Sequence, residues 1–170
     1  MKDTVFALST ARGKAGVAVV RVSGPMAHGA GSRLTQNRLP PERVASVRRL
    51  FDYQGLLLDE GLVIVFCENA SFTGEPTIEF QVHGSEAVVK ALLRELGTIP
   101  GLRQAEPGEF SRRALENGAL DLTQVEALSD LIEAETEAQR RQALSLMSGA
   151  LGQRISMVRA SLVQAGALLE

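Results

Sequence analysis

Two charged residues interrupt apolar stretches of this 170-residue chain and are the first candidates for chemistry. Arg21 lies within Val17-Ala-Val-Val-Arg-Val-Ser-Gly24, and Glu79 lies between Ile78 and Phe80. A lone guanidinium is costly to desolvate, so Arg21 must reach solvent or pair with an anion. A carboxylate in a strand can accept two parallel N–H donors, from a heterocycle or from an arginine. From the residues alone, a structural salt bridge between the two and a ligand-binding role for either are equally open.

Two further segments combine turn residues with charged groups in a short span. The first, Ser71-Phe-Thr-Gly-Glu75, is a turn that leads into the strand carrying Glu79. The second, Ala105-Glu-Pro-Gly-Glu-Phe-Ser-Arg-Arg-Ala114, contains a turn and a short helix that ends near Asn117-Gly118. Glycine and proline at these places favour tight turns, so both segments are expected to bring charged side chains to defined positions.

The motifs of the common catalytic classes are absent. The sequence has no G-x-x-x-x-G-K-[ST] phosphate loop, no G-x-G-x-x-G and no H-E-x-x-H. His28 and His83 lie in different segments, and a lone Cys67 cannot form an intrachain disulfide. His83 is expected to be a strand-end or core histidine, and Cys67 a buried, inert thiol. We therefore assign no catalytic residue and no metal ligand.

Charge is distributed unevenly along the chain. Residues 1–55 carry nine Lys and Arg against three Asp and Glu, a net charge of +6, whereas residues 56–170 have a net charge of −8. Five arginines lie close together in the first part: Arg33, Arg38, Arg43, Arg48 and Arg49. This asymmetry fits either a face that binds phosphate or carboxylate groups or an ordinary solvated surface. With 4% aromatic residues and no Trp, the chain has little with which to stack on single-stranded bases.

Composition and length limit the class of protein. At 45% apolar and 22% charged residues the chain is neither disordered nor membrane-spanning, since its longest uncharged apolar run is Leu62–Cys67. No basic start followed by an apolar segment and a cleavage site is present, so secretion is not expected. The chain is expected to be cytoplasmic, reduced and free of membrane contact.

The first part of the chain alternates strands and helices, as in an α+β fold. Short β-branched runs bounded by turn residues predict strands at Thr4–Ser9, Val17–Val22, Val47–Tyr53, Leu62–Phe66 and Thr77–His83. One helix is expected from about Pro25, and another over Ser85–Leu96, with Ser85 as N-cap and Gly97 as C-cap.

From Gly108 the pattern becomes helical. A long helix is expected to start at Thr123 as N-cap, with Glu126 completing a capping box. Its apolar stripe continues as a heptad-like seam, which Gly149 and Gly152 interrupt: Leu144, Met147, Leu151, Ile155, Val158, Leu162, Ala165 and Leu169. Because the seam runs to the last residues, the chain is expected to be the front part of a longer protein. We predict a domain over residues 1–118 and the start of a helical domain over 119–170.

Taken together, the motifs resemble the N-terminal part of the tRNA-modification GTPase family known as MnmE or TrmE. The matching text covers almost the whole chain: Asp3-Thr4, Gly16–Gly24, Leu58-Asp59, Ser71–Glu75, His83-Gly84, Pro107–Phe110, Leu120–Leu122, Gln124, Glu126-Ala127, Asp130–Ile132 and Ser148–Ala150. The combination of SFTGE, EPGEFSRRA and LDLTQVEALSDLIEA is very specific.

This resemblance implies a folate-binding, dimer-forming domain similar to the tetrahydrofolate domain of aminomethyltransferases, followed by the first helices of a helical domain. It implies a homodimer that binds 5-formyl-tetrahydrofolate and works with a flavin-dependent partner, MnmG or GidA. Together they would add a carboxymethylaminomethyl-type group at C5 of the wobble uridine in tRNA. GTP, Mg and K ions would act in a GTPase domain that this chain lacks, so the chain alone is expected to hydrolyse no GTP.

Carried over residue by residue, the resemblance places the folate contacts on Arg21 and Glu79. Many relatives have a third contact, a Lys, where this chain has Ala119, and Thr10-Ala-Arg-Gly-Lys14 replaces a Pro-Pro-Gly-Arg-Gly loop. Two alternatives stay open. A free-standing folate-dependent aminomethyltransferase would need a catalytic acid or base beyond Glu79, and a helical interaction module would leave Arg21 unexplained.

Overall fold

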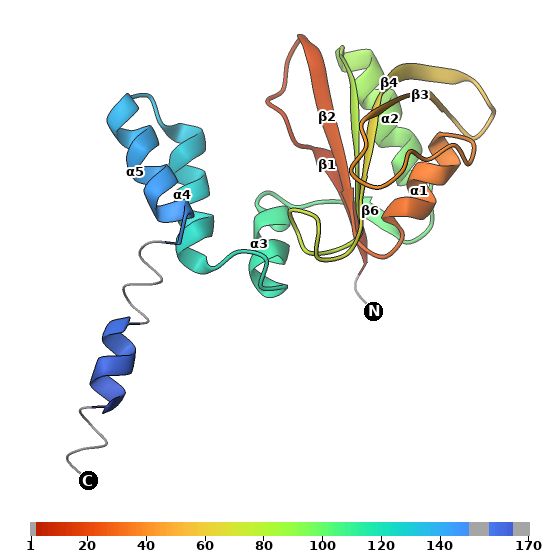
Figure 1. Ribbon diagram of the computed structural model, residues 1–170. Helices are drawn as coiled ribbons and strands as arrows, with labels where there is room; N and C mark the ends of the chain where they lie inside the picture. Colours follow the sequence, from red (N-terminus) through yellow and green to blue (C-terminus); the bar gives the residue numbers. More distant parts are fainter. Residues whose placement is uncertain (1–2, 150–156, 165–170) are drawn as a thin grey trace. The chain divides into compact units, whose positions relative to one another are not determined.

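The computed structural model of the protein describes residues 3–149 and 157–164 (Figure 1). The chain divides into two compact units, Met1–Ala119 and Leu120–Glu170. A mixed sheet and its helices form the first unit, and helices form the second, so the prediction of a mixed α and β fold followed by helices is confirmed. Each unit is described by itself below.

A six-stranded sheet forms the centre of the first unit (Figure 1). Its strands are β1 (Thr4–Leu8), β2 (Ala15–Ser23), β3 (Ser46–Phe51), β4 (Leu57–Phe66), β5 (Thr77–Gly84) and β6 (Leu102–Gln104). Their spatial order is β3-β4-β5-β2-β1-β6. All neighbours are antiparallel except β1 and β6, which run parallel. The two long strands β2 and β5 therefore lie side by side in the middle.

Helices α1 (Ala27–Leu34) and α2 (Glu86–Gly97) cover one face of this sheet. Alternate strand residues point toward them, as the period of two requires. In the buried core these strand residues pack with Leu34, Leu92 and Leu96 of the helices, and Phe80 and Ile78 of β5 are fully buried there. Each such side chain contributes about 1.5–3 kcal/mol relative to exposure. The covered face thus carries the stability of the unit.

The opposite face, called the open face here, carries the residues that alternate with the core. It includes Val17, Val19 and Arg21 of β2, Glu79 and Gln81 of β5, Leu62 and Ile64 of β4, and Val47 of β3. The strand register aligns Val19 with Gln81, Gln81 with Leu62, and Leu62 with Val47. Val17 and Val47 are each 56% exposed, so apolar side chains on this face contact solvent.

Several element boundaries differ from the predicted ones. Strand β4 starts five residues earlier than expected because its first half, Leu57–Gly61, pairs with Arg48–Phe51 of β3 but lacks a continuous apolar pattern of its own. Strand β6 was missed, since three residues are too few to show alternation. Gly97 closes α2 as its last helical residue and Thr98 is the C-cap, so that prediction was wrong, whereas Ser85 accepts from Val88 N as predicted.

Two helices of the second unit, α4 (Leu122–Glu133) and α5 (Glu137–Met147), pack against each other. The predicted cap Thr123 is wrong: Asp121 is the N-cap, and its carboxylate accepts from Gln124 N, while Gln124 Oε1 accepts from Asp121 N. The predicted single long helix is also wrong, because a second capping box at Thr136 starts α5. The seam residues Leu151, Ile155, Ala165 and Leu169 lie outside the described residues.

No helix within residues 3–149 and 157–164 has both the length and the apolar character to cross a membrane. Cys67 is exposed at the end of β4, contrary to the buried thiol that was expected. His83 lies at the exposed end of β5, as expected, with its Nδ1 2.8 Å from Asp59 Oδ1.

Candidate functional site

Arg21 and Glu79 lie opposite each other on β2 and β5 and form an ion pair on the open face. Nε and Nη2 of Arg21 each lie 2.8 Å from the same carboxylate oxygen, Glu79 Oε1. The side chains are 20% and 16% exposed, so the pair is largely but not fully shielded from water. Glu79 Oε2 makes no hydrogen bond to the described part of the chain and remains able to accept one.

Two phenylalanine rings flank the guanidinium of Arg21. Its Cζ lies 4.9 Å from the ring centre of Phe72 and 5.4 Å from that of Phe110. Such cation–π contacts hold an arginine in place at about 0.5–2 kcal/mol each. Phe72 comes from the loop before β5, and Phe110 from helix α3 (Glu109–Glu116). Sequence reasoning singled out both segments as motifs but did not assign these rings to the site.

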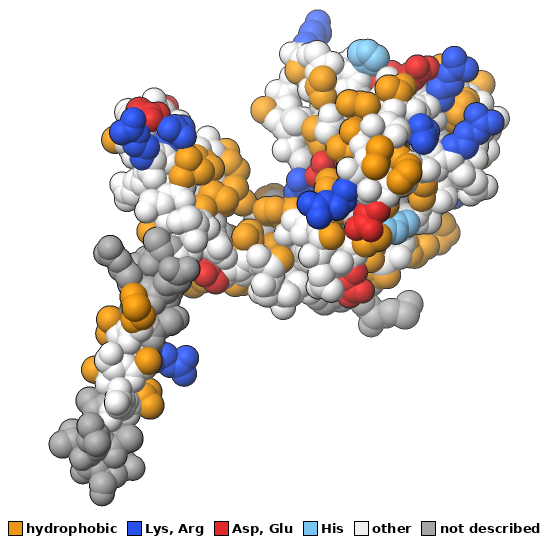
Figure 2. Space-filling model, viewed as in Figure 1, with side chains coloured by type: hydrophobic (Ala, Val, Ile, Leu, Met, Phe, Trp, Pro, Cys, Tyr) orange, Lys and Arg blue, Asp and Glu red, His pale blue; other side chains and the backbone are white. Residues whose placement is uncertain are grey.

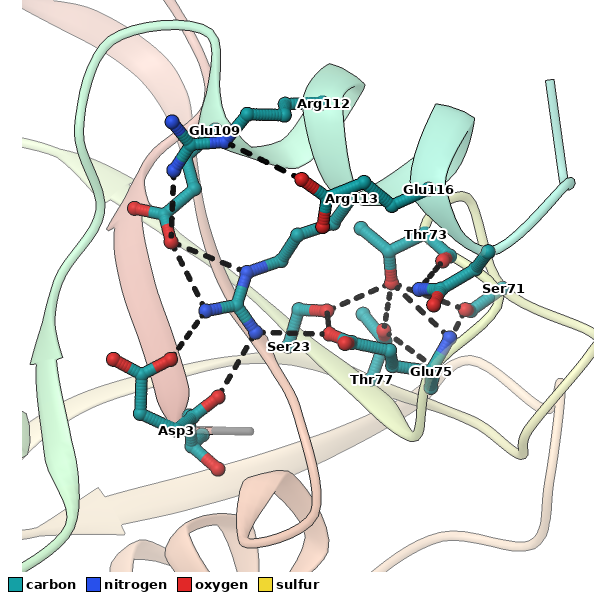
Figure 3. Close-up of polar contacts among 12 residues, drawn as sticks. Asp3, Ser23, Ser71, Thr73, Glu75, Thr77, Glu109, Arg112, Arg113 and Glu116 are labelled. Atoms are coloured by element: carbon teal, nitrogen blue, oxygen red, sulfur yellow. Dashed lines mark hydrogen bonds and ion pairs between the residues drawn. The ribbon is translucent and has the colours of Figure 1, made fainter. Parts of the chain in front are cut away.

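Arg113 of α3 is the centre of a second, buried cluster of charges (Figure 3). Its guanidinium contacts Asp3 Oδ1 at 2.6 Å, Glu109 Oε1 at 3.0 Å and Glu75 Oε2 at 3.2 Å. The side chains of Arg113, Glu75 and Glu109 are only 7%, 9% and 1% exposed. One arginine therefore ties together α3, the loop before β5 and the start of β1.

Hydroxyl groups extend this cluster into the loop that carries Phe72. Ser23 Oγ donates to Glu75 Oε2 at 2.9 Å, and therefore accepts from Thr73 Oγ1 at 2.7 Å (Figure 3). Asn117, at the end of α3, donates from Nδ2 to the backbone carbonyl of Thr73 at 2.7 Å. The loop and α3 are thus linked by two contacts, Arg113 with Glu75 and Asn117 with Thr73, which hold Phe72 and Phe110 close to Arg21.

Glu109 is the most strongly perturbed carboxylate of the cluster. Hydrogen bonds from Arg103, from the backbone N–H of Glu106 and from Arg113 lower its pKa to about 2, against the opposing effect of burial. Glu109 is therefore ionised at neutral pH. Its charge balances the two guanidiniums, which indicates a structural task.

Ala119 lies beside the same loop. Gly74 has a φ of +75°, and a Cβ atom added to it would lie 3.2 Å from the Cβ of Asn117 and 3.7 Å from the Cβ of Ala119. The position where the resemblance implies a lysine therefore adjoins the turn that carries Phe72, and it is exposed.

A groove of about 360 Å³ lies on the open face toward the end of β5, and its lining does not include Arg21 or Glu79. Val17, Val47 and Leu62 provide its apolar lining, and Gln81, two residues after Glu79, provides an amide. Within the residues that the structure describes, no group of three His, Cys, Asp or Glu side chains could hold a metal ion. The arrangement is suited to binding a planar, partly apolar ligand with N–H donors.

Family comparisons agree with the division of the chain. Residues 4–119 match the model described as GTP-binding protein TrmE N-terminus, and residues 122–170 match the MnmE helical domain. Curated proteins named tRNA modification GTPase MnmE are similar over nearly the whole chain. The one from Ruegeria pomeroyi is 59% identical over 168 residues, and the one from Dinoroseobacter shibae is 56% identical over 168 residues.

Each of these two alignments covers 99% of this chain and 39% of the relative, so the chain spans about two fifths of the length of the curated relatives it matches. A relative from Caulobacter vibrioides is 56% identical over 170 residues, which cover 37% of its length. Because both family models match in order and together cover almost all residues, the chain belongs to the TrmE/MnmE family and corresponds to its N-terminal and helical regions.

Proposed function

We propose that this chain binds 5-formyl-tetrahydrofolate through Arg21 and Glu79, as the N-terminal part of a GTPase that modifies tRNA. The observation that carries the proposal is the Arg21–Glu79 pair, which lies close to Phe72 and Phe110 on the same face as an apolar groove. The family resemblance implies a fold similar to the folate-binding domain of aminomethyltransferases, and the bound folate would supply a one-carbon unit.

The donor and acceptor groups suit a pterin ring. Glu79 Oε2 is available for one N–H donor, and Oε1 can accept a second if Arg21 gives up one of its two bonds to that oxygen. The guanidinium group released in this way can then donate to a carbonyl or carboxylate oxygen of the ligand. The apolar groove beyond Gln81 would take the less polar part of the molecule.

Titration calorimetry with 5-formyl-tetrahydrofolate tests the assignment. Glu79→Gln replaces one acceptor oxygen by a donor that faces the ring N–H groups, at a cost of about 1–3 kcal/mol, up to roughly a hundredfold in affinity. Glu86→Gln is the matched control, because Glu86 is an exposed carboxylate on α2, which covers the other face of the sheet. Equal affinity of both variants would leave the Arg21–Glu79 pair as a structural salt bridge.

The second part of the proposal is that two copies of the chain form a homodimer through the first unit, Met1–Ala119. Its support is the open face, where Val17, Val47 and Leu62 are exposed. Light scattering should give about twice the 18.2 kDa of one chain. Leu62→Glu should yield monomer, whereas Leu162→Glu, at an exposed position of the segment 157–164, should not. The reverse pattern would assign self-association to the helices.

We further propose that the complete protein acts in the cytoplasm with a flavin-dependent partner, MnmG or GidA, to add a carboxymethylaminomethyl group to wobble uridine. GTP, Mg and K ions would act in its GTPase domain. The printed sequence has no phosphate loop, so the chain alone should release no phosphate from GTP. Turnover that persists through purification would contradict this part of the proposal.

A further inference from the structure

A second groove, of about 570 Å³, lies along β3, the strand at the edge of the sheet. Its lining includes Arg38, Val47, Arg48, Arg49, Phe51 and Glu60. Figure 2 shows several Lys and Arg side chains over the region of β3 and β4. This groove extends to the outer edge of the sheet, away from the Arg21–Glu79 pair, since β4 and β5 separate β3 from β2.

Two of its three arginines carry charge that no carboxylate of the described residues neutralises. Arg48 donates from Nε to the carbonyl of Arg38 at 2.6 Å and from Nη1 to the carbonyl of Val47 at 2.8 Å. These bonds orient the guanidinium but leave its positive charge uncompensated. The side chain of Arg38 is exposed and makes no ion pair or hydrogen bond within the described segments. Arg49, by contrast, pairs with Glu60 at 3.0 Å.

From this geometry we propose that the β3 edge binds the sugar–phosphate backbone of an RNA. Arg38 and Arg48 would each neutralise a phosphate, and Phe51 would contact a sugar between them. The guanidinium group of arginine has several N–H donors whose geometry matches phosphate oxygens. Because two backbone carbonyls already orient Arg48, less side-chain entropy is lost when it binds a phosphate. The identity of the RNA as tRNA rests on the proposed function above.

A polymer fits this site better than a small anion does. Most of the lining side chains are exposed, so a single phosphate would stay hydrated and gain little from one surface arginine. A polyanion that crosses the groove instead meets both guanidiniums at once and releases bound counterions at each contact.

Fluorescence anisotropy with labelled tRNA, at 50 and 200 mM salt, tests the proposal on the 170-residue chain. Arg38→Gln and Arg48→Gln should each weaken binding several-fold and lower the slope of log K against log salt by about 1. Arg48→Lys should keep most of the affinity, since the charge remains. Arg94→Gln is the matched control: Arg94 is exposed on α2, outside the groove, and pairs with no carboxylate within the described residues.

Three results would overturn the proposal. The first is equal tRNA affinity of Arg38→Gln and Arg94→Gln, and the second is displacement of tRNA by inorganic phosphate at the same total phosphate concentration. The third is binding of the chain to phosphatidylserine vesicles but not to tRNA. The side chain of Arg38 makes no hydrogen bond or ion pair within the described residues, so its variant should fold normally and should retain the folate affinity of the wild type. If the chain binds folate but not tRNA, only the RNA site at the β3 edge is rejected. If it binds tRNA but not folate, only the folate site is rejected.

Discussion

Arg113 Nη1 lies 3.2 Å from Glu75 Oε2, and this contact joins helix α3 to the loop before β5. The same two elements supply Phe110 and Phe72, the rings close to Arg21. A buried ion pair is weak as a source of stability compared with apolar packing, but breaking it leaves an uncompensated charge. The pair therefore helps to fix the relative position of these two elements.

Removing Arg113 should be strongly destabilising. Arg113→Ala removes a buried guanidinium from contact with Glu75 and Glu109, at an expected cost of about 3–5 kcal/mol in the free energy of unfolding, measured by urea denaturation. Its neighbour Arg112 gives the control, because that side chain is 54% exposed and lies 3.5 Å from the exposed Glu106. Arg112→Ala should cost less than about 1 kcal/mol. Similar losses for the two variants would contradict the central role of Arg113.

The pKa of Glu109 predicts how stability depends on pH. Hydrogen bonds from Arg103 foremost lower this pKa from 4.5 to about 2, so the ionised carboxylate stabilises the folded state. Its contribution, about 3 kcal/mol, is fully present above pH 4.5 and is lost as the pH falls toward 2. Urea denaturation between pH 7 and pH 3 should therefore show a steeper decline for the wild type than for Glu109→Gln. Parallel curves would show that other carboxylates cause the acid sensitivity.

The sequence pattern predicted the strands that carry the site because both are long and alternate clearly. Arg21 and Glu79 stood out as charges in apolar runs, and the register of β2 and β5 brings them together. The cluster around Arg113 was not predictable in this way. Its partners are distant in sequence, since Asp3 and Arg113 are 110 positions apart, and only the tertiary fold brings them within hydrogen-bond distance.

The helical unit shows a different limit of pattern reasoning. Asp121 and Thr123 are both good N-cap residues, and each has a Gln or Glu three residues later, so two registers were compatible with the sequence. The structure has Asp121 as the cap, with Thr123 Oγ1 donating to its carboxylate at 2.6 Å. A shift of two residues changes which side chain satisfies the first backbone N–H groups.

This difference can be measured. Asp121→Ala removes the acceptor for Gln124 N and should destabilise α4 by about 1 kcal/mol, seen as a lower midpoint in thermal unfolding followed by circular dichroism. Thr123→Ala removes only a bond to the cap and should have a clearly smaller effect. A larger effect of the Thr123 variant would restore the capping register predicted from the sequence.

The last prediction concerns Ala119, where the family resemblance implies a lysine. Ala119 is exposed and adjoins Gly74 in the loop that carries Phe72, so a lysine side chain there can extend over the mouth of the proposed folate site. Its ammonium group would complement the carboxylates of a folate while staying largely solvated, which limits the gain to about 1 kcal/mol, or roughly fivefold in affinity.

Titration calorimetry of Ala119→Lys with 5-formyl-tetrahydrofolate should show this gain. Ala138→Lys makes the same charge change at an exposed position of α5 and should bind like the wild type. The gain at Ala119 should shrink as salt is added, because exposed charges are screened over about 10 Å at 0.1 M ionic strength. Equal affinities of the two lysine variants would mean that the ligand does not pass near the 71–76 loop, and Arg21 and Glu79 would then lose their support as folate contacts.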